Sequence, residues 1–323
     1  MTGPVTALVT GASGFIGQAL VARLTQSGHR VVVLTRNAQN LFPAGVQSRV
    51  GDLATGAGVS PELFDGVGTV FHCAGEVKDA ARMRQVHVGG TQRLLECLSQ
   101  SVDRQRRPVH WVQLSSVGAY GPPAVMDRSR QVDEDTQENP VGAYETSKTE
   151  SDRLIIQAAR AGLLSHSILR PSNVIGARMP NASLRAMIAM IGRRRFVYIG
   201  KPGAVATYVH VDDVVSALAE CARNPAAQGQ TFNLSSDCLL EELVERAAKI
   251  LGVRPPRLRL PEPLMRAAVG VTPKWKRIPL TASRIDALVN RTRYPSTRIE
   301  STLGFQFSKP MPAGIDDLIV TGA

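Results

Sequence analysis

Short apolar segments alternate with helical patterns along much of this chain. Mostly apolar segments of the length of a buried strand lie at 5–9, 31–34, 69–74, 109–114 and 167–169. Between them, apolar residues recur every three or four positions, as at 18–24, 86–100 and 154–158. That spacing is typical of amphipathic helices. Strands separated by helices favour a parallel sheet covered on both faces. The pattern therefore predicts an α/β fold built on a doubly wound parallel sheet.

The alternation is interrupted after residue 172 and again after residue 235. Residues 173–207 carry a helical pattern and a basic turn but no long apolar strand, and the tail after 235 contains helical segments and a Pro/Arg-rich linker. We therefore expect a larger sheet domain and a smaller substrate-binding domain. The expected limits are 1–172 plus 208–235 for the first, and 173–207 plus 236–323 for the second.

A glycine-rich turn follows the first predicted strand and leads directly into a helical pattern. It reads Thr10-Gly11-Ala12-Ser13-Gly14-Phe15-Ile16-Gly17, a GxxGxxG spacing. Glycines let the backbone turn tightly and approach a pyrophosphate, which the N–H groups and dipole of the helix start then hold. A plain tight turn is the alternative. In this strand–turn–helix context we expect a dinucleotide to be bound by Gly11, Ser13, Gly14, Phe15, Ile16 and Gly17.

The end of the second predicted strand bears on the choice of cofactor. An acidic residue here would bind the ribose 2′-hydroxyl of NAD, but this strand ends in Thr35-Arg36. Arg36 can pair with the 2′-phosphate of NADP, so NADP is favoured over NAD; the alternative is that Arg36 only faces solvent. Further along, Asp52 is placed to accept from the adenine amino group. We also expect cofactor contacts from Leu53, Ala74 and Gly75, the last two being small residues beside which a flat cofactor can lie.

Three residues carry candidate chemistry at the predicted carboxyl edge of the sheet. Ser116 follows the strand at 109–114, and Tyr144 and Lys148 lie one turn apart at the start of a helical pattern. A tyrosine pKa of about 10 is too high for a general base near neutrality, and a neighbouring lysine cation would lower it. A serine hydroxyl can hold the substrate oxygen beside the phenol. This set predicts interconversion of an alcohol and a ketone with hydride transfer at carbon.

These motifs together resemble the extended short-chain dehydrogenases/reductases of the NAD-dependent epimerase/dehydratase family. TGASGFIG, GDL, HCAG, SSVGAYG, YETSK, RPSNVIG and YVHVDD occur in the order of that family and cover nearly the whole chain. The resemblance implies a Rossmann domain with a small C-terminal substrate domain, and a homodimer. It implies Ser116 as donor to the substrate oxygen, Tyr144 as the acid/base and Lys148 as a ligand of the nicotinamide ribose. Pro171 and Asn173 would border the nicotinamide and the substrate.

The chain departs from the pattern of that family at several positions. Val117 and Gly118 stand where dehydratases of the family carry an Asp-Glu pair, which argues against dehydration. Ala206 stands where many UDP-sugar epimerases have an Arg that binds the pyrophosphate. His87 replaces the Asn of the NVxGT motif, and we expect it to pack or to bond toward the cofactor side. The missing charge at 206 could come from the basic tail, chiefly from Arg291 and Arg293 and also from Arg284.

Composition limits the class of protein and of partner. The formal net charge is +11, and residues 254–298 hold eleven Lys and Arg against two acidic residues. The alternatives are a solvated face, attraction of a phosphate-bearing substrate, and weak contact with an anionic membrane surface. Nucleic acid is disfavoured, because no nucleic-acid recognition motif is present. Scattered Cys and His argue against a metal site, and with no transmembrane segment or signal peptide we expect a cytoplasmic protein.

Taken together, the sequence predicts an NADP-preferring reductase, or else an epimerase, that acts on a keto or hydroxyl carbon of a nucleotide-linked sugar. One alternative is a reductase of a carbonyl compound without a nucleotide, such as a sterol- or flavonoid-like ketone, which Ala206 leaves open. The other is a dinucleotide-sensing protein without catalysis. That alternative is disfavoured because Ser116, Tyr144 and Lys148 are all present.

Overall fold

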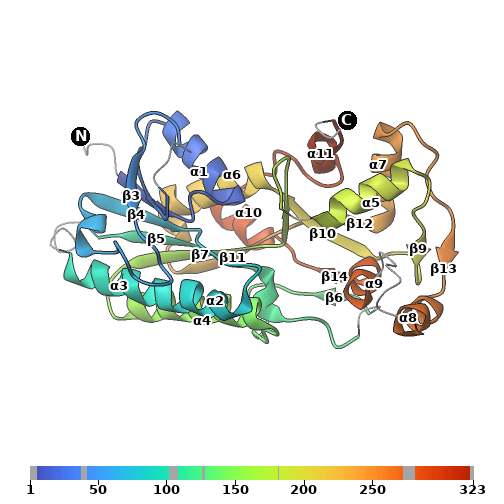
Figure 1. Ribbon diagram of the computed structural model, residues 1–323, viewed down its shortest axis with the longest axis horizontal. Helices are drawn as coiled ribbons and strands as arrows, with labels where there is room; N and C mark the ends of the chain where they lie inside the picture. The colour runs from blue at the N-terminus through green and yellow to red at the C-terminus, as the bar shows by residue number, and fades with distance from the viewer. Residues whose placement is uncertain are drawn as a thin grey trace.

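A seven-stranded parallel sheet forms the larger part of the molecule (Figure 1). The computed structural model describes residues 6–37, 42–101, 108–125, 128–180, 182–271 and 281–320. The strand order is β11-β7-β5-β4-β1-β2-β3. In chain order the strands are β1 (Thr6–Thr10), β2 (Arg30–Thr35), β3 (Gln47–Val50), β4 (Val67–His72), β5 (His110–Leu114), β7 (Ser165–Pro171) and β11 (Gln230–Leu234).

Helices cover both faces of this sheet (Figure 1). One face carries α1 (Phe15–Gln26), α6 (Val211–Arg223) and α10 (Thr297–Leu303). The other carries α2 (Ala80–Arg84), a π-helical turn (Gln85–Gly89), α3 (Gly90–Gln100) and α4 (Ala143–Arg160). The predicted doubly wound α/β fold is therefore confirmed.

Neighbouring residues of the central strands enter different cores, which explains why these strands are apolar throughout. Val9 and Val33 pack in the core under α1 and α6, whereas Leu8 and Val32 pack in the core under α3 and α4. Side chains of a strand alternate between its two faces, so a sheet covered on both sides has apolar residues at every position. The largest fully buried side chain is Trp111 on β5.

Smaller sheets and helices form the other end of the molecule (Figure 1). A three-stranded sheet has the order β12 (Ser236–Leu239), β10 (Val205–His210), β8 (Asn173–Ile175). A second core lies here, with apolar residues from α5 (Ala182–Gly192) and α7 (Leu240–Ile250). The remaining elements are β6 (Arg130–Gln131), β9 (Tyr198–Ile199), β13 (Arg259–Leu260), α8 (Glu262–Val271), α9 (Ala282–Val289), β14 (Thr292–Arg293) and α11 (Asp316–Val320).

The C-terminal tail does not stay within this second region. Ile299, Leu303 and Phe305 pack into the core under α1 and α6, so α10 returns to the large sheet. The predicted limits assign all of 236–323 to the substrate-binding domain and so do not foresee that α10 packs on the large sheet. The division into two domains stays a prediction. None of the described helices is both long and apolar enough to span a bilayer.

The strand order reverses beside β1, which places a crevice at the carboxyl ends of the central strands. β1 pairs with β2 on one side and with β4 on the other. The chain therefore leaves the centre in opposite directions, and the loops after β1 and β4 separate. Ligands of open α/β sheets bind at this position.

Candidate active site

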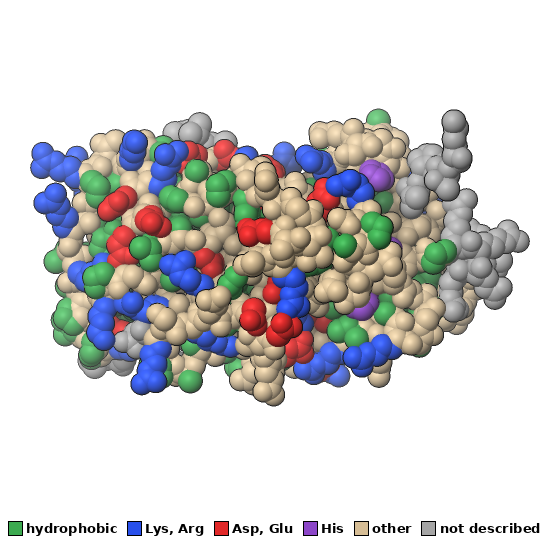
Figure 2. Space-filling view, turned by 180° about the vertical axis from the view of Figure 1, so that it is seen from behind, with side chains coloured by type: hydrophobic (Ala, Val, Ile, Leu, Met, Phe, Trp, Pro, Cys, Tyr) green, Lys and Arg blue, Asp and Glu red, His purple; other side chains and the backbone are tan. Residues whose placement is uncertain are grey.

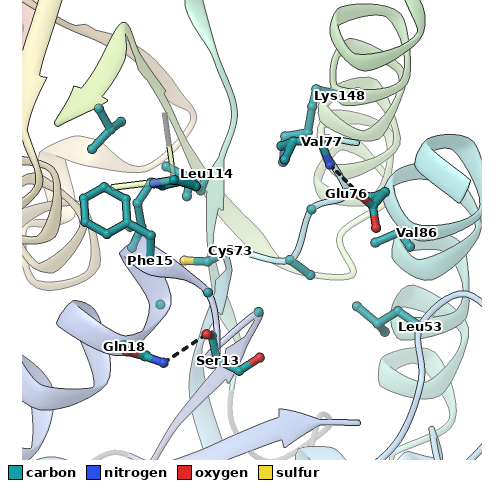
Figure 3. Close-up of a pocket in the computed structure, with 18 of the residues that line it drawn as sticks. Ser13, Phe15, Gln18, Leu53, Cys73, Glu76, Val77, Val86, Leu114 and Lys148 are labelled. Atoms are coloured by element: carbon teal, nitrogen blue, oxygen red, sulfur yellow. Dashed lines mark hydrogen bonds between the residues drawn. The ribbon is translucent and has the colours of Figure 1, made fainter. Parts of the chain in front are cut away.

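A pocket of about 890 Å³ lies at this crevice (Figure 3). The turn between β1 and α1 forms one wall, the loop after β4 lies across the middle, and Lys148 projects from α4 on the far side (Figure 3). Every residue predicted to contact the cofactor lines the pocket, as do Ser116 and Asn173. These residues are Gly11, Ser13, Gly14, Phe15, Ile16, Gly17, Arg36, Asp52, Leu53, Ala74, Gly75, Tyr144, Lys148 and Pro171.

The glycines of the turn are required by close backbone approach. Gly11 has φ +68°, and a Cβ there would lie 2.6 Å from the backbone of Ala74 at the end of β4. A Cβ at Gly17 would lie 2.2 Å from the Gly11 carbonyl oxygen. No side chain caps the first N–H groups of helix α1. This arrangement fits a pyrophosphate group.

Basic side chains surround the position that a dinucleotide would take. Arg36 is exposed and lines the pocket at the end of β2. Lys78 and Arg178 also line it, and the Arg178 guanidinium lies 3.5 Å from the Gln18 amide oxygen on α1. Sequence reasoning did not identify these two, because they lie outside the motifs. The Arg178 contact joins residues 160 positions apart in the chain.

The predicted adenine contact, Asp52, is partly engaged by the protein. Its Oδ1 accepts from the Ala54 N–H at 2.8 Å, and its Oδ2 lies 3.9 Å from Arg82. The side chain still lines the pocket. The residues present therefore fit an NAD(P) cofactor at both the pyrophosphate and the adenosine end. In the described part of the chain, no three His, Cys, Asp or Glu side chains gather as a metal site would require.

Ser116, Tyr144 and Lys148 come together at the other end of the pocket. Ser116 caps the 3-10 turn Val117–Tyr120, and its Oγ accepts from the Gly118 N–H at 3.1 Å. Tyr144 and Lys148 stand one turn apart on α4, and Lys148 is 5% exposed. The set can hold a substrate oxygen and exchange a proton with it.

The pKa of Tyr144 runs opposite to the sequence argument. Burial raises it to about 12, and the carboxylates of Glu145 and Asp152 add to this effect. The net shift is therefore upward, against the lowering expected from Lys148, because burial disfavours the charged phenolate. Burial also lowers the pKa of Lys148, which Asp152 partly opposes. Tyr144 therefore carries its proton at neutral pH in this state.

A buried ion pair beneath the site joins the elements that carry its residues. Asp152 on α4 is fully buried; its Oδ2 accepts from the Ser115 Oγ at 2.5 Å and lies 3.3 Å from Arg170 on β7. Arg170 also pairs with Glu138. Ser115 precedes Ser116, and Arg170 precedes Pro171. The pair thus fixes α4, β5 and β7 relative to one another where the pocket begins.

A second buried polar chain runs below the glycine turn. The Thr10 Oγ1 and His72 Nδ1 are 2.6 Å apart, and the His72 Nε2 lies 3.1 Å from the Thr91 Oγ1. Thr91 in turn contacts Ser151 at 2.8 Å, and Ser151 accepts from Gln113. Burial lowers the pKa of His72 well below its usual value, so the ring is neutral. These contacts connect β1, β4, α3, α4 and β5, and no sequence motif indicated them.

The predicted substrate contact Asn173 begins a row of polar residues across the three-stranded sheet. Its amide donates to the Thr207 carbonyl oxygen at 3.1 Å, and Thr207 stands opposite Asp237. Burial raises the pKa of Asp237 to about 6, while Arg293 lowers it. Asp237 accepts from the Tyr294 N–H at 2.6 Å. Arg293 itself is exposed and does not line the cofactor pocket.

The other predicted substrate cation, Arg291, is engaged elsewhere. Its guanidinium donates to the Pro202 carbonyl oxygen, and it is not among the residues that line the pocket. Ala206, at the position where the resemblance implies an Arg, is buried on β10. The structure therefore brings Asn173 but not Arg291 or Arg293 to the pocket, and their substrate role stays a prediction.

Several cations of the basic region 254–298 have acidic partners. The N···O distances of these pairs are 2.6 to 2.8 Å for Arg259 with Glu241, Arg266 with Glu262 and Asp286, and Arg298 with Asp135. Figure 2 shows Lys and Arg scattered over one face with Asp and Glu between them. Pairing weakens the field that would attract an anionic surface. Lys274, Lys276 and Arg277 lie outside the described residues, and membrane contact stays a prediction.

Comparison with known proteins agrees with this geometry. The chain is 28% identical over 88% of its length to dTDP-6-deoxy-L-talose 4-dehydrogenase (NAD(P)(+)) of Kitasatospora kifunensis, covering 90% of that protein. It is 31% identical over 78% of its length to UDP-glucose 4-epimerase of Mycolicibacterium smegmatis, covering 86% of it. A 3 beta-hydroxysteroid dehydrogenase/Delta 5-->4-isomerase of Mycobacterium tuberculosis is 28% identical over 84% of this chain and 75% of its own length.

A solved structure, MoeE5 in complex with UDP-glucuronic acid and NAD, superimposes with a TM-score of 0.74. It is 25% identical, and the match covers 98% of both chains. Residues 7–235 match the pattern of the NAD dependent epimerase/dehydratase family.

The fold and pocket define an α/β enzyme of the short-chain dehydrogenase/reductase type. The parallel sheet has the arrangement that the sequence predicted, and the glycine turn and Ser116, Tyr144 and Lys148 line one pocket. The chain belongs to the NAD dependent epimerase/dehydratase family. The family resemblance on which the sequence analysis relied is thereby confirmed.

Proposed function

We propose that this protein catalyses NAD(P)-dependent reduction or epimerisation at a keto or hydroxyl carbon of a nucleotide-linked sugar. One observation carries the proposal: Ser116, Tyr144 and Lys148 line the same pocket as the GxxGxxG turn. The named activities of the Kitasatospora and Mycolicibacterium relatives, and the UDP-glucuronic acid bound to MoeE5, support a nucleotide sugar as substrate.

Each of the three residues has a distinct task in this proposal. The nicotinamide, when bound, supplies or accepts the hydride at the substrate carbon. Tyr144 exchanges a proton with the substrate oxygen, and Ser116 holds that oxygen. The Ser116 Oγ accepts from the Gly118 N–H, so its own hydrogen can be donated to the substrate. Lys148 places a positive charge beside the phenol and is positioned to bind ribose hydroxyls.

Reduction needs a proton donor at the substrate oxygen, and Tyr144 can serve as that donor. With its pKa raised to about 12 by burial, the phenol is a proton donor at neutral pH. A keto oxygen that receives a hydride at its carbon needs such a donor. The test is mass spectrometry of small molecules bound to the purified protein, followed by assays of keto-sugar nucleotides with NADPH and NADH. Absence of turnover with every keto-sugar nucleotide would overturn reduction as the direction of the reaction.

The cofactor in this proposal is NADP rather than NAD, because Arg36 stands at the end of β2. Replacing Arg36 by Asp is expected to weaken NADPH binding roughly tenfold or more, since a hydrogen bond to a charged group contributes about 1.5–3 kcal/mol. NADH binding should change much less. Fluorescence titration with both cofactors measures this. Arg30→Asp, the same charge change at the exposed start of β2, is the matched control. Equal losses for NADPH and NADH would contradict the role of Arg36.

A non-nucleotide carbonyl compound is the second candidate substrate. Ala206 favours it, because no cation stands there for a diphosphate, and the steroid dehydrogenase relative agrees with it. If the substrate does carry a diphosphate, a cation other than one at position 206 must bind it. Exposed Arg293, beside the row of polar residues that begins at Asn173, is the best placed cation for this.

We expect Arg293→Gln to raise the KM for a nucleotide diphosphate sugar roughly tenfold, by loss of a charge-assisted hydrogen bond. Steady-state kinetics with saturating cofactor gives the result. Exposed Arg254, changed to Gln, controls for loss of net charge. An unchanged KM in the Arg293 variant would favour a substrate without a diphosphate.

A further inference from the structure

His87 stands between the cofactor side and the catalytic side of the pocket without lining it. It belongs to the π-helical turn Gln85–Gly89 before α3, and it is 1% exposed. On one side lies the loop after β4, and on the other the start of α4. Burying an imidazole costs free energy unless both of its ring nitrogens form hydrogen bonds.

The hydrogen bonds of His87 fix its tautomer. The Glu76 backbone N–H can only donate, and it lies 2.9 Å from the His87 Nε2, so Nε2 is the acceptor. Burial and the nearby Lys148 lower the pKa of His87 to about 3, so the ring is neutral. The proton must then be on Nδ1, which donates to the Ser147 Oγ at 2.8 Å.

On the cofactor side, the ring shapes the loop that lines the pocket. A Cβ at Gly75 would lie 3.3 Å from the His87 Nε2, so the imidazole occupies the space that a side chain would need. The Glu76 carboxylate accepts from the N–H groups of Val77 and Lys78 at 2.9 and 2.8 Å. Gly75, Glu76, Val77 and Lys78 all line the pocket, and Figure 3 labels Glu76 and Val77 there.

On the catalytic side, the chain of bonds ends at the backbone that carries Tyr144. The Ser147 Oγ accepts from His87, and its one hydroxyl hydrogen is shared between the carbonyl oxygens of Ala143 at 2.6 Å and Tyr144 at 3.1 Å. The His87 ring also packs edge-on against the Tyr144 ring, with centroids 5.5 Å apart and an interplanar angle of 84°. His87 thus holds the first turn of α4 through Ser147, and it contacts the phenol ring of Tyr144 directly.

We infer that His87 is a positioning residue that couples the cofactor-facing loop 75–78 to Tyr144 through Ser147. The inference rests on the proposed function for the role of Tyr144. Movement of the loop on cofactor binding would be transmitted to the first turn of α4, and a misplaced phenol lowers the rate even when the cofactor is bound. The neutral ring does this as donor and acceptor at once, a task that an imidazolium cannot perform, because it has no acceptor.

Two conservative variants separate the two ends of this connection. In His87→Gln, the amide oxygen can reach the position of Nε2 and accept from Glu76, but the bond to Ser147 is lost. In His87→Asn, the amide nitrogen takes the position of Nδ1 and donates to Ser147, but the bond to Glu76 is lost. The dissociation constant of NAD(P)H, from nicotinamide fluorescence, and kcat at saturating cofactor are measured for both, after thermal unfolding shows that both are folded.

The expected result is opposite losses in the two variants. His87→Gln should lose roughly tenfold in kcat and keep its cofactor affinity, because only the tyrosine side is released. His87→Asn should lose roughly fivefold or more in cofactor affinity and keep most of its kcat, because a neutral hydrogen bond to the loop is gone. Ser147→Ala should lower kcat as His87→Gln does, and the double variant should lose little more than either.

Equal losses of kcat and affinity in both variants, or additive losses with Ser147→Ala, would overturn the inference and leave His87 as a packing residue. The cofactor titrations keep this test separate from that of the proposed function. If Tyr144 proved dispensable, the affinity loss in His87→Asn would still report on the loop.

Discussion

Replacing Tyr144 by Phe is expected to reduce turnover by roughly 100-fold or more while the cofactor still binds, since general acid–base catalysis contributes about 10²–10⁴-fold. The substitution removes one oxygen from a side chain that lines the pocket. The ring stays, so its packing against His87 is kept. The effect should fall on kcat, because the phenol acts on the substrate oxygen in the transition state.

Stopped-flow and steady-state assays with a keto-sugar nucleotide measure the loss, and cofactor titration checks the binding site. Tyr198→Phe serves as the matched control, because it removes the same atom from a tyrosine buried in the second core. A Tyr144 variant that keeps most of its turnover would remove this residue from the mechanism. Loss of cofactor binding together with activity would instead indicate that Tyr144 acts through the cofactor site.

Replacing Asp152 by Ala is expected to lower the free energy of unfolding by about 3 kcal/mol, the lower end of the range for breaking a buried ion pair. The side chain is fully buried and pairs with Arg170, which is 3% exposed. Its loss leaves the Arg170 charge with Glu138 alone and removes the partner of the Ser115 hydroxyl. Glu138 is partly exposed, so it compensates only in part.

Urea unfolding of the variant and the wild type gives the difference. Glu138→Gln, which removes the more exposed partner of the same arginine, should cost about 1 kcal/mol or less, as partly exposed ion pairs do. A loss of less than about 1 kcal/mol for Asp152→Ala would mean that Glu138 alone satisfies Arg170. Because Ser115 precedes Ser116, activity should fall in the Asp152 variant beyond what its folded fraction explains.

The fold and the lining of the pocket could be predicted because they follow from consecutive residues. The glycine turn works through backbone approach at Gly11 and Gly17, and the strands before and after it are continuous apolar runs. A strand, a turn and a helix that are adjacent in sequence must also be adjacent in space. Tyr144 and Lys148 share one helix turn for the same reason. Such local features need no knowledge of the rest of the chain.

The groups that set the chemistry of the site could not be predicted in the same way. The Arg170–Asp152 pair, the His72 chain and the His87–Ser147 bond join residues of separate elements. The predicted lowering of the Tyr144 pKa was wrong in direction, because burial, a property of the packed state, raises this pKa. Arg291 looked available to a substrate and is held by Pro202.

The sequence by itself determined the parallel α/β sheet, the family and those pocket residues that belong to its motifs. Periodicity and glycine spacing act over a few neighbouring positions, so they are fixed before the chain folds. Only the tertiary structure decided which charges are paired, which side chains are buried and how Tyr144 is held. Those properties depend on distance and on exclusion of water, and both exist only once distant segments have packed together.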